Sequence, residues 1–216
     1  MITLAIEAAT YQGSVALLDD RGVLCERSVA MRGREHEALM PAVAEVLADT
    51  GIAVTSLERV VCGAGPGAFT SLRIAGGIAK GLALAIGIPL YPVSSLALIV
   101  SSHELQAGLY VAAIDAMRGE SYVAAFRVRD DGEVIAEGGV SIVPSADIAV
   151  AGATLVGPSV SHTASLGPHA RGVIHLATLI ASAGPADLAG WEPAYGRMAE
   201  AQVKWEAEHG RPLRVP

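Results

Sequence analysis

The sequence is poor in charge, in aromatic side chains and in cysteine. Of its 216 residues, 17% are charged and 4% are aromatic, and the two cysteines are Cys25 and Cys62. These positions have no metal-ligand spacing and form no disulfide framework, so both are expected to be small buried side chains in a reducing compartment. Apolar residues make up 52% of the chain, which is long enough to bury a core without metal or disulfides.

Dense basic runs and long hydrophobic segments are also lacking. The formal net charge is −7, whereas proteins that bind nucleic acid directly need a basic face to neutralise phosphates. The start, MITLAIEAAT, has no basic signal-peptide region. The longest apolar run, GLALAIGIPLYPV, is interrupted by Gly87, Pro89 and Pro92 and is shorter than the ~20 residues of a membrane helix. We therefore expect a soluble cytoplasmic protein with no membrane span that does not bind RNA or DNA on its own.

Two segments of the chain are similar to each other. LAIEAATYQGSVALLDDRGVL begins at Leu4, and AAIDAMRGESYVAAFRVRDDGEVI begins at Ala112. In both, a short apolar strand ends in Ile and a carboxylate, and an Asp-Asp turn later reverses the chain between two further strands. One offset of 108 relates three pairs of residues, which are Ile6 and Ile114, Glu7 and Asp115, and Val15 and Val123.

Each segment continues into a weaker common pattern, in which RVVCGAGPG and ATLVGPS both indicate a buried strand before a Gly-Pro loop. Apolar residues at steps of three and four predict a helix over 36–50, with Pro41 either kinking it or lying in its first turn. We predict an α/β fold of two duplicated lobes, 1–100 and 101–216, each a mixed sheet with helices, with a helical tail at the C-terminus. This plan resembles a truncated form of the actin-like (ASKHA, ribonuclease H-like) ATPases. Chance similarity of two hairpins is the alternative.

The glycine-rich segment GAGPGAFTSLRIAGGIAKG, at 63–81, raises the question of a phosphate-binding loop. Lys80 is followed by Gly81 and not by Ser or Thr, so the P-loop pattern is absent. Ala68 and Thr70 stand where the dinucleotide pattern needs its third glycine. A helix is expected to open near Thr70, with the hydroxyl group as its cap. Its N-terminus can still bind an anion weakly.

The same predicted helix has two ridges with almost no side chains. They recur at every fourth position, as Gly77, Gly81 and Ala85, and as Ala75, Ala79 and Ala83. Each glycine in a helix interior costs roughly 1 kcal/mol relative to alanine, so we expect close approach of the chain's own sheet or of another helix. The helix also has large apolar residues that must be buried, Leu72, Ile74, Ile78 and Leu82, which favours an interface with another protein. Packing in the chain's own core is the alternative, above all for the alanine ridge.

These residues resemble a known family. GPGAFTSLRIAGGIAKGLA is similar to the GPGSFTGLRIG signature of the TsaB (YeaZ) family, the non-catalytic partners in bacterial synthesis of threonylcarbamoyladenosine on tRNA. The similarity extends to both hairpins, to REHEALMPAVAEVLADTGI and to WEPAYGRMAEAQVKWEAEHGRPL. Ala68, Ser71 and Ala75 replace the usual Ser, Gly and Gly, and IEAAT replaces IDTS, which argues against an intact nucleotide site.

The resemblance implies a scaffold that is not an enzyme. Such a subunit activates the complex that forms N6-threonylcarbamoyladenosine at position 37 of tRNAs reading ANN codons. It does so by forming a heterodimer with the catalytic subunit TsaD, together with a TsaE-like ATPase, and it can also form a homodimer. The isolated chain is expected to bind no cofactor, ATP or ADP lying instead at the junction of the complex, and tRNA is contacted only through the complex. Two other functions stay open, a small ATP-dependent phosphotransferase of the sugar-kinase-like superfamily and a metallopeptidase-like protein.

The resemblance and the helix patterns together give the candidate residues. No catalytic residue or metal site is predicted, because the His-x-x-x-His of TsaD corresponds to His36 and Met40, and one imidazole is too few ligands. Glu7, Thr10 and Asp115 are expected to be remnants of nucleotide loops, the two carboxylates either holding Mg²⁺ or capping local N–H groups. The candidate contacts to a junctional nucleotide are Arg73 and Lys80. The predicted partner interface comprises His36, Leu39, Met40, Val43, Leu47, Phe69, Leu72, Arg73, Gly77, Lys80 and Gly81.

Overall fold

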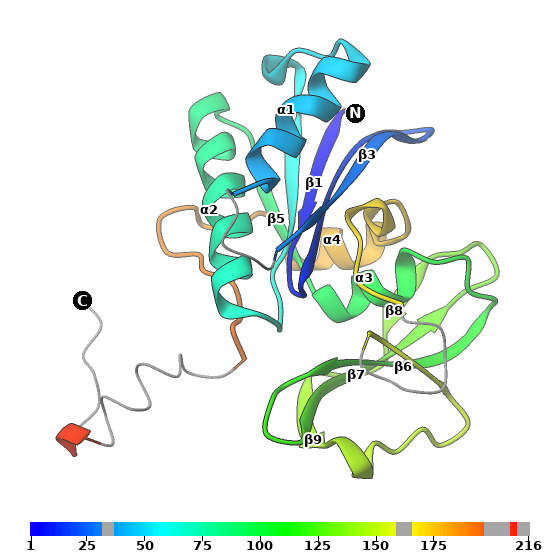
Figure 1. Ribbon diagram of the computed structural model, residues 1–216. Coiled ribbons are helices and arrows are strands. Elements are labelled where there is room, and N and C mark those ends of the chain that lie inside the picture. The colour runs from blue at the N-terminus through cyan, green and yellow to red at the C-terminus, as the bar shows by residue number, and fades with distance from the viewer. Residues whose placement is uncertain (32–36, 159–165, 197–207, 211–216) are drawn as a thin grey trace.

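The computed structural model describes residues 1–31, 37–158, 166–196 and 208–210, and within them the chain forms two mixed sheets in two lobes (Figure 1). Each sheet contains an antiparallel hairpin and gains a parallel strand from later in the sequence. The predicted fold class, an α/β protein of two duplicated lobes, is confirmed.

The first sheet has the strand order β3-β2-β1-β4-β5. Its central strand, β1, is buried along its whole length because it pairs with β2 on one side and β4 on the other, while helices cover both faces. Helices α1 and α2 lie on one face, and α3 lies on the other (Figure 1). The elements are β1 (Thr3–Glu7), β2 (Gln12–Asp19), β3 (Gly22–Ala30), α1 (Leu39–Thr50), the 3-10 helix η1 (Val54–Ser56), β4 (Arg59–Gly63), α2 (Phe69–Ile86), β5 (Leu90–Val93) and α3 (Ser95–Ser101).

The second sheet has the order β10-β6-β7-β8, and β9 also pairs with β7. β10 runs parallel to β6 as β4 runs parallel to β1, so the weaker pattern shared by the two halves corresponds to equivalent strands. No helix of the expected length lies between β7 and β10, where all residues are described and only a short 3-10 helix occurs. The elements are β6 (Gly108–Asp115), β7 (Glu120–Val128), β8 (Val134–Ala136), β9 (Ser141–Pro144), the 3-10 helix η2 (Ser145–Asp147) and β10 (Thr154–Val156).

The two hairpins of the repeat differ by one residue in register. Ile6 pairs with Val15 in the first, whereas Ile114 pairs with Tyr122 in the second. The offset of 108 therefore relates β1 to β6 but fails in β7, where Tyr122 takes the place that corresponds to Val15. Because a shift of one residue reverses the face of a strand, Val123 lies in a small separate cluster while Tyr122 lies in the main core.

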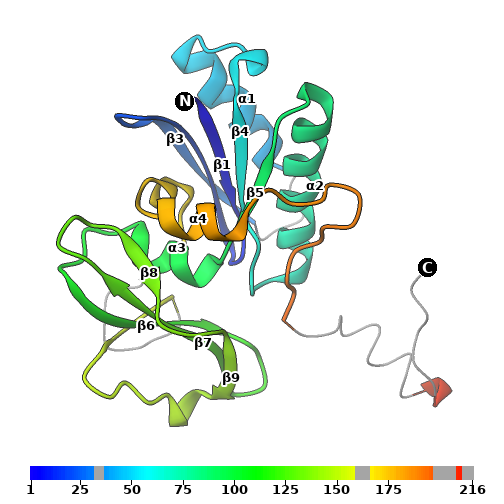
Figure 2. The same ribbon diagram turned by 180° about the vertical axis from the view of Figure 1, so that it is seen from behind.

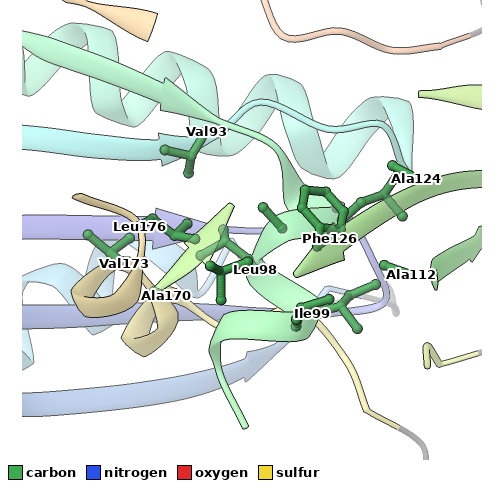
Figure 3. Packing of buried hydrophobic residues seen from close by; sticks show 14 of the residues in the cluster. Val93, Leu98, Ile99, Ala112, Ala124, Phe126, Ala170, Val173 and Leu176 are labelled. Carbon is green, nitrogen blue, oxygen red and sulfur yellow. The ribbon is translucent and has the colours of Figure 1, made fainter. Parts of the chain in front are cut away.

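The main core lies between the two sheets and is centred on α3. Every residue of this helix is buried, as expected for a helix that is apolar around its circumference. Figure 3 shows Leu98 and Ile99 of α3 among side chains from the second sheet, such as Phe126, and from the later segment that carries Val173 and Leu176. The two lobes are therefore joined by a continuous hydrophobic core.

Residues 166–196 return from the second lobe to the first (Figure 2). The 3-10 helix η3 (Ala170–His175) contacts the first sheet, and α4 (Ala177–Ala183) contacts β5 of the first sheet and β8 of the second. We call residues 186–196, which follow α4, the strap. Its residues Leu188 and Trp191 pack against the core of the first lobe. The lobe boundary near residue 100 remains a prediction, and residues 166–196 contact both sheets.

Helix α1 begins at Leu39, three residues after the start of the predicted segment. The Glu37 carboxylate caps it by accepting the N–H of Leu39 at 2.5 Å and that of Met40 at 3.2 Å. Pro41 lies in the first turn, where the N–H that proline lacks has no partner in the helix.

Helix α2 begins at Phe69. The residue before the helix is Ala68, and its start has no side-chain cap, so the capping role predicted for Thr70 is wrong. By length and composition, α2 is the one helix among the described residues that could cross a membrane, although its apolar stretches are interrupted by Arg73 and Lys80. A core helix meets the same criteria, and one ridge of α2 is fully buried against the first sheet.

Candidate functional site

Glu7 ends β1 with its side chain fully buried. Its Oε1 accepts the N–H of Ala9 at 2.5 Å, and its Oε2 accepts the hydroxyl of Ser95 at 2.9 Å. Ser95 Oγ in turn accepts the N–H of Gly65 at 3.1 Å. A β-carbon at Gly63 would lie 1.7 Å from Glu7 Oε2, so only glycine leaves room for the carboxyl group there. Glu7, expected to be a remnant of a nucleotide loop, thus uses its carboxyl group for hydrogen bonds within the protein.

Burial raises the pKa of Glu7 from 4.5 to about 7, although the hydrogen bonds from Ala9 and Ser95 lower it. The carboxyl group is therefore partly protonated at neutral pH, which makes it a poor ligand for Mg²⁺. Burial, with the nearby charge of Glu7, also raises the pKa of the Cys62 thiol well above its usual value. That thiol is consequently not a nucleophile.

The other two hairpin residues also close their own turns. Asp115 lies on the surface and accepts the N–H of Met117 at 2.7 Å. Thr10 Oγ1 donates to Gln12 O at 3.0 Å and accepts the Gln12 N–H at 3.3 Å. The interpretation of Glu7 and Asp115 as caps of local N–H groups is confirmed. Among the described residues, no three His, Cys, Asp or Glu side chains gather into a potential metal site.

The two ridges of α2 face different surroundings. Ala75, Ala79 and Ala83 are fully buried in the first lobe, so core packing accounts for them. Gly77 and Gly81 are exposed, and a β-carbon on either would meet nothing within 4 Å. The described part of the chain therefore gives no steric reason for glycine at these two positions.

The strap runs along the neighbouring side of α2 (Figures 1 and 2). Lys80 Nζ donates to Trp191 O at 2.9 Å. A β-carbon at Gly76 would lie 3.0 Å from Pro193 Cγ, so this third glycine, unlike Gly77, is explained by the strap. Lys80 was predicted to contact a nucleotide or a partner, and here it holds the strap.

An aromatic contact attaches the end of the strap to the start of α2. The rings of Phe69 and Tyr195 have centroids 4.5 Å apart, and the guanidinium of Arg73 lies 5.4 Å from the Phe69 centroid. Phe69 is half-buried by this contact, whereas Arg73 is exposed. Of the two cations predicted to meet a nucleotide, Arg73 is the more accessible.

Three of the predicted interface side chains lie in the chain's own core, namely Leu39, Val43 and Leu72. Each is at most 1% exposed, so none is available to a partner in this structure. Helix periodicity identifies a buried face without indicating what buries it. Met40, 42% exposed, and Leu47, half-buried, remain on the surface of α1. His36 lies outside the described residues.

Sequence reasoning missed a cluster that joins His169 to β3, because its members are far apart in the chain. His169 Nε2 lies 3.1 Å from Ser28 Oγ, and Glu26 Oε2 lies 4.0 Å from Nδ1, an arrangement similar to a hydrolase triad. However, Nδ1 accepts the N–H of Arg171 at 3.1 Å, so the neutral ring carries its proton on Nε2. Burial, reinforced by the charges of Arg171 and His103, lowers the pKa of His169 to about 4. The ring thus donates to Ser28 and cannot take its proton, which argues against peptidase chemistry.

Comparison with known sequences identifies relatives of this architecture. A family model described as TsaD, tRNA N6-adenosine threonylcarbamoyltransferase, matches residues 29–164. The tRNA threonylcarbamoyladenosine biosynthesis proteins TsaB of Haemophilus influenzae and Escherichia coli are each 37% identical to this chain, over 59% and 61% of its length. These matches span only 56% and 58% of the two relatives. An uncharacterized protein of Mycobacterium tuberculosis is 36% identical over 69% of this chain and 71% of its own length.

Solved structures extend the similarity to most of the chain. YeaZ from Pseudomonas aeruginosa has a TM-score of 0.78 and 30% identity, covering 90% of this chain and 99% of its own. A second Pseudomonas aeruginosa structure, of a protein described as similar to peptidase YeaZ, has a TM-score of 0.79 at 30% identity, with 91% and 99% coverage. The TsaD family model matches more than half of the chain. By sequence and by fold, the chain belongs to the TsaB (YeaZ) family.

Proposed function

We propose that this chain is a non-catalytic scaffold subunit of the complex that forms N6-threonylcarbamoyladenosine at position 37 of tRNAs reading ANN codons. It acts in the cytoplasm by forming a heterodimer with a TsaD-type catalytic subunit, and a TsaE-type ATPase joins the assembled complex. The names of its TsaB relatives, tRNA threonylcarbamoyladenosine biosynthesis proteins, support a part in this pathway. The net charge of −7 supports contact with tRNA through the complex rather than through this chain alone.

The choice of contact face rests on the exposed glycines of α2. Gly77 and Gly81 together cost about 2 kcal/mol relative to alanine, yet no described atom approaches either position within 4 Å. Close packing of a partner helix against α2 needs such small residues. We define the partner face as the exposed or half-buried residues Met40, Leu47, Arg73, Gly77, Gly81 and Leu84.

The partner face also includes exposed large apolar side chains. Leu84 on α2 is 62% exposed and Met40 on α1 is 42% exposed. Methionine adapts its shape readily to a contacting surface. When no TsaD-type subunit is present, the same face would pair two copies of this chain.

The chemistry of the described residues supports a non-catalytic role. Glu7 and Asp115 close local turns, and His169 is a hydrogen-bond donor to Ser28 rather than a base. A nucleotide at the heterodimer junction would be contacted by Arg73, because Lys80 already donates to the strap. ATP or ADP is therefore expected to bind the complex and not the isolated chain.

Gel filtration with a TsaD-type subunit tests the proposal. The wild type should co-elute with it and restore threonylcarbamoyl transfer to tRNA, while this chain alone should show no transfer. Gly81→Leu should fold normally, since its side chain enters open space, but should no longer co-elute. Gly138→Leu is the matched control, because Gly138 is also exposed with nothing within 4 Å but lies in the second lobe.

Two outcomes would distinguish an error in the scaffold role from an error in the choice of contact face. If the wild type never co-elutes with the catalytic subunit, the scaffold proposal fails. If the wild type and Gly81→Leu co-elute equally well, the scaffold role stands and the choice of α2 as the contact face is wrong.

A further inference from the structure

Glu7 is a buried carboxyl group that is held by neutral groups. Its side chain is fully buried, and it accepts the N–H of Ala9 at 2.5 Å and the hydroxyl of Ser95 at 2.9 Å. A buried charge is costly unless an opposite charge pairs with it. The protonated form of the carboxyl group is therefore favoured for as long as the side chain stays enclosed.

Two paths of hydrogen bonds lead from this carboxyl group to residues 64–68, which we call the β4–α2 loop. On the first path, Ser95 Oγ accepts the N–H of Gly65 at 3.1 Å, and Ser95 N donates to Gly65 O at 2.9 Å. On the second path, the carbonyl oxygen of Ala9 accepts the N–H of Ala68 at 2.7 Å. Ala68 is the residue before α2. The carboxyl group thus fixes the loop at both of its ends.

The β4–α2 loop in turn holds the end of the strap. Ala194 N donates to Ala64 O at 2.7 Å, and a β-carbon at Gly65 would lie 2.5 Å from Ala194 O. Residues 64–66 also line a cavity of about 420 Å³ between the two lobes. The loop therefore has unfilled space beside it, into which it can move.

The elements packed around Glu7 supply no charge to neutralise it. The titratable side chain beside it is the Cys62 thiol of β4, whose pKa is raised well above its usual value by burial. α3, the β4–α2 loop and the paired residue of β2, Ser14, carry no titratable or charged side chain. The 3-10 helix η3, which contacts β1, carries Arg171, already engaged in an ion pair, and follows His169, whose ring is neutral at pH 7.

We propose that Glu7 forms a proton-controlled latch on the β4–α2 loop, closed while the carboxyl group is protonated and released when it ionises. The ionised carboxylate gains solvation only if the loop moves away and admits water. Because the same loop binds Ala194 and precedes α2, its release loosens the end of the strap and the start of α2 together. The latch is a property of the single chain, so it does not depend on the proposed heterodimer.

Amide hydrogen exchange of the full chain, followed by NMR between pH 5 and 7, tests the latch. Because the pKa of Glu7 is about 7 in the closed form and 4.5 when water reaches the side chain, release should become roughly 40-fold more frequent over this range, after correction for the intrinsic exchange rate. The amides of Ala9, Gly65 and Ala194 should lose protection by this factor. In Glu7→Gln their protection should stay constant, because glutamine does not titrate.

The amides of β6 and β7 are the internal control. Where they exchange through global unfolding, the opposite change of His169 over this range offsets that of Glu7, so their protection should stay nearly constant. Asp115→Asn is the matched variant, because Asp115 occupies the equivalent place in the second hairpin but is exposed. It should keep the wild-type profile.

Three results would overturn the latch. The first is the same pH profile for Gly65 and Ala194 in the wild type and in Glu7→Gln. The second is a loss of protection confined to Ala9, which would show that Glu7 ionises without moving the loop. The third is an equal loss in β6 and β7, which would assign the effect to global unfolding. If Glu7→Gln does not fold, the comparison of the loop with β6 and β7 in the wild type decides by itself.

Discussion

Ser95 Oγ donates a 2.9 Å hydrogen bond to Glu7 Oε2 across 88 residues of sequence. Through the Gly65 N–H, the same hydroxyl group also holds the loop that follows β4. The carboxyl group at the end of β1 therefore fastens three segments of the first lobe, and Gly63 leaves the space that it occupies. Any change at Glu7 should register first in stability and only then in partner binding.

Glu7→Gln should alter the pH dependence of unfolding. Because the folded-state pKa of Glu7 is raised from 4.5 to about 7, the folded protein binds this proton more tightly than the unfolded chain. The associated stability is fully present below pH 4.5 and is lost as the pH rises through 7, by up to about 3 kcal/mol. His169 contributes a change of opposite sign to both proteins over part of this range, so the quantity to follow is the stability of the wild type minus that of the variant. Urea unfolding between pH 4.5 and 8 should show this difference falling as the pH rises. Parallel stability profiles of the wild type and Glu7→Gln against pH would contradict this prediction.

His169→Asn should remove a pH effect of the opposite sign. The pKa of His169 falls from 6.5 to about 4 on folding, mainly through burial, so the unfolded chain binds the proton more tightly. The wild type should keep this stability above pH 6.5 and lose it as the pH falls through 4, by up to about 3 kcal/mol. Asparagine can still accept the Arg171 N–H but does not titrate. Urea unfolding between pH 4 and 7 measures the difference in stability between the two proteins, in which the contribution of Glu7 cancels. A difference that stays constant over this range would rule out His169 as the source.

Gly77→Ala and Gly81→Ala should each stabilise the isolated chain by about 1 kcal/mol, because the new methyl group meets nothing within 4 Å. The melting temperature should rise by roughly 2–4 °C for each. Gly76→Ala is the control, since its β-carbon would lie 3.0 Å from Pro193 Cγ and the gain should be smaller or absent. A similar rise at all three positions would show that the strap does not pack closely on α2.

Lys80→Met should loosen the strap. It removes the 2.9 Å hydrogen bond to Trp191 O from a half-buried position, at a cost of roughly 1 kcal/mol. Limited proteolysis should then cleave residues 186–196 faster. Arg21→Met, which removes a mainly exposed cation paired with Asp19, should leave the rate unchanged. If both variants resist the protease like the wild type, the bond to Lys80 does not hold the strap.

Local chemistry made much of the fold predictable. The Asp-Asp turns and the alternating strands located both hairpins, and the spacing of apolar residues located α1 and α2 within a few residues. The repeat could be recognised because β1 and β6 keep their common offset. The one-residue register difference in β7 could not be predicted from the sequence. Tyr122 and Val123 are both suited to a buried strand, and only the length of the turn decides which of them pairs with Ile114.

The candidate site was less predictable because its contacts are distant in sequence. Leu39, Val43 and Leu72 have the spacing of a buried face, but the chain's own core buries them and not a partner. Nothing in the sequence of residues 186–196 indicates that they pack on α2, so the role of Lys80 could not be foreseen. The burial of Glu7 depends on Gly63 and Ser95, which only the folded structure brings beside it.

The return of the strap has a consequence for synthesis of the protein. The five strands of the first sheet are complete once β5 has been made, but the side chains of Leu188 and Trp191, which cover its core, emerge much later. The apolar surface of the first lobe that these side chains cover is therefore exposed while the second lobe is being synthesised. Domains usually fold in order during translation, whereas here the packing of the first lobe is completed only after the second lobe has been made.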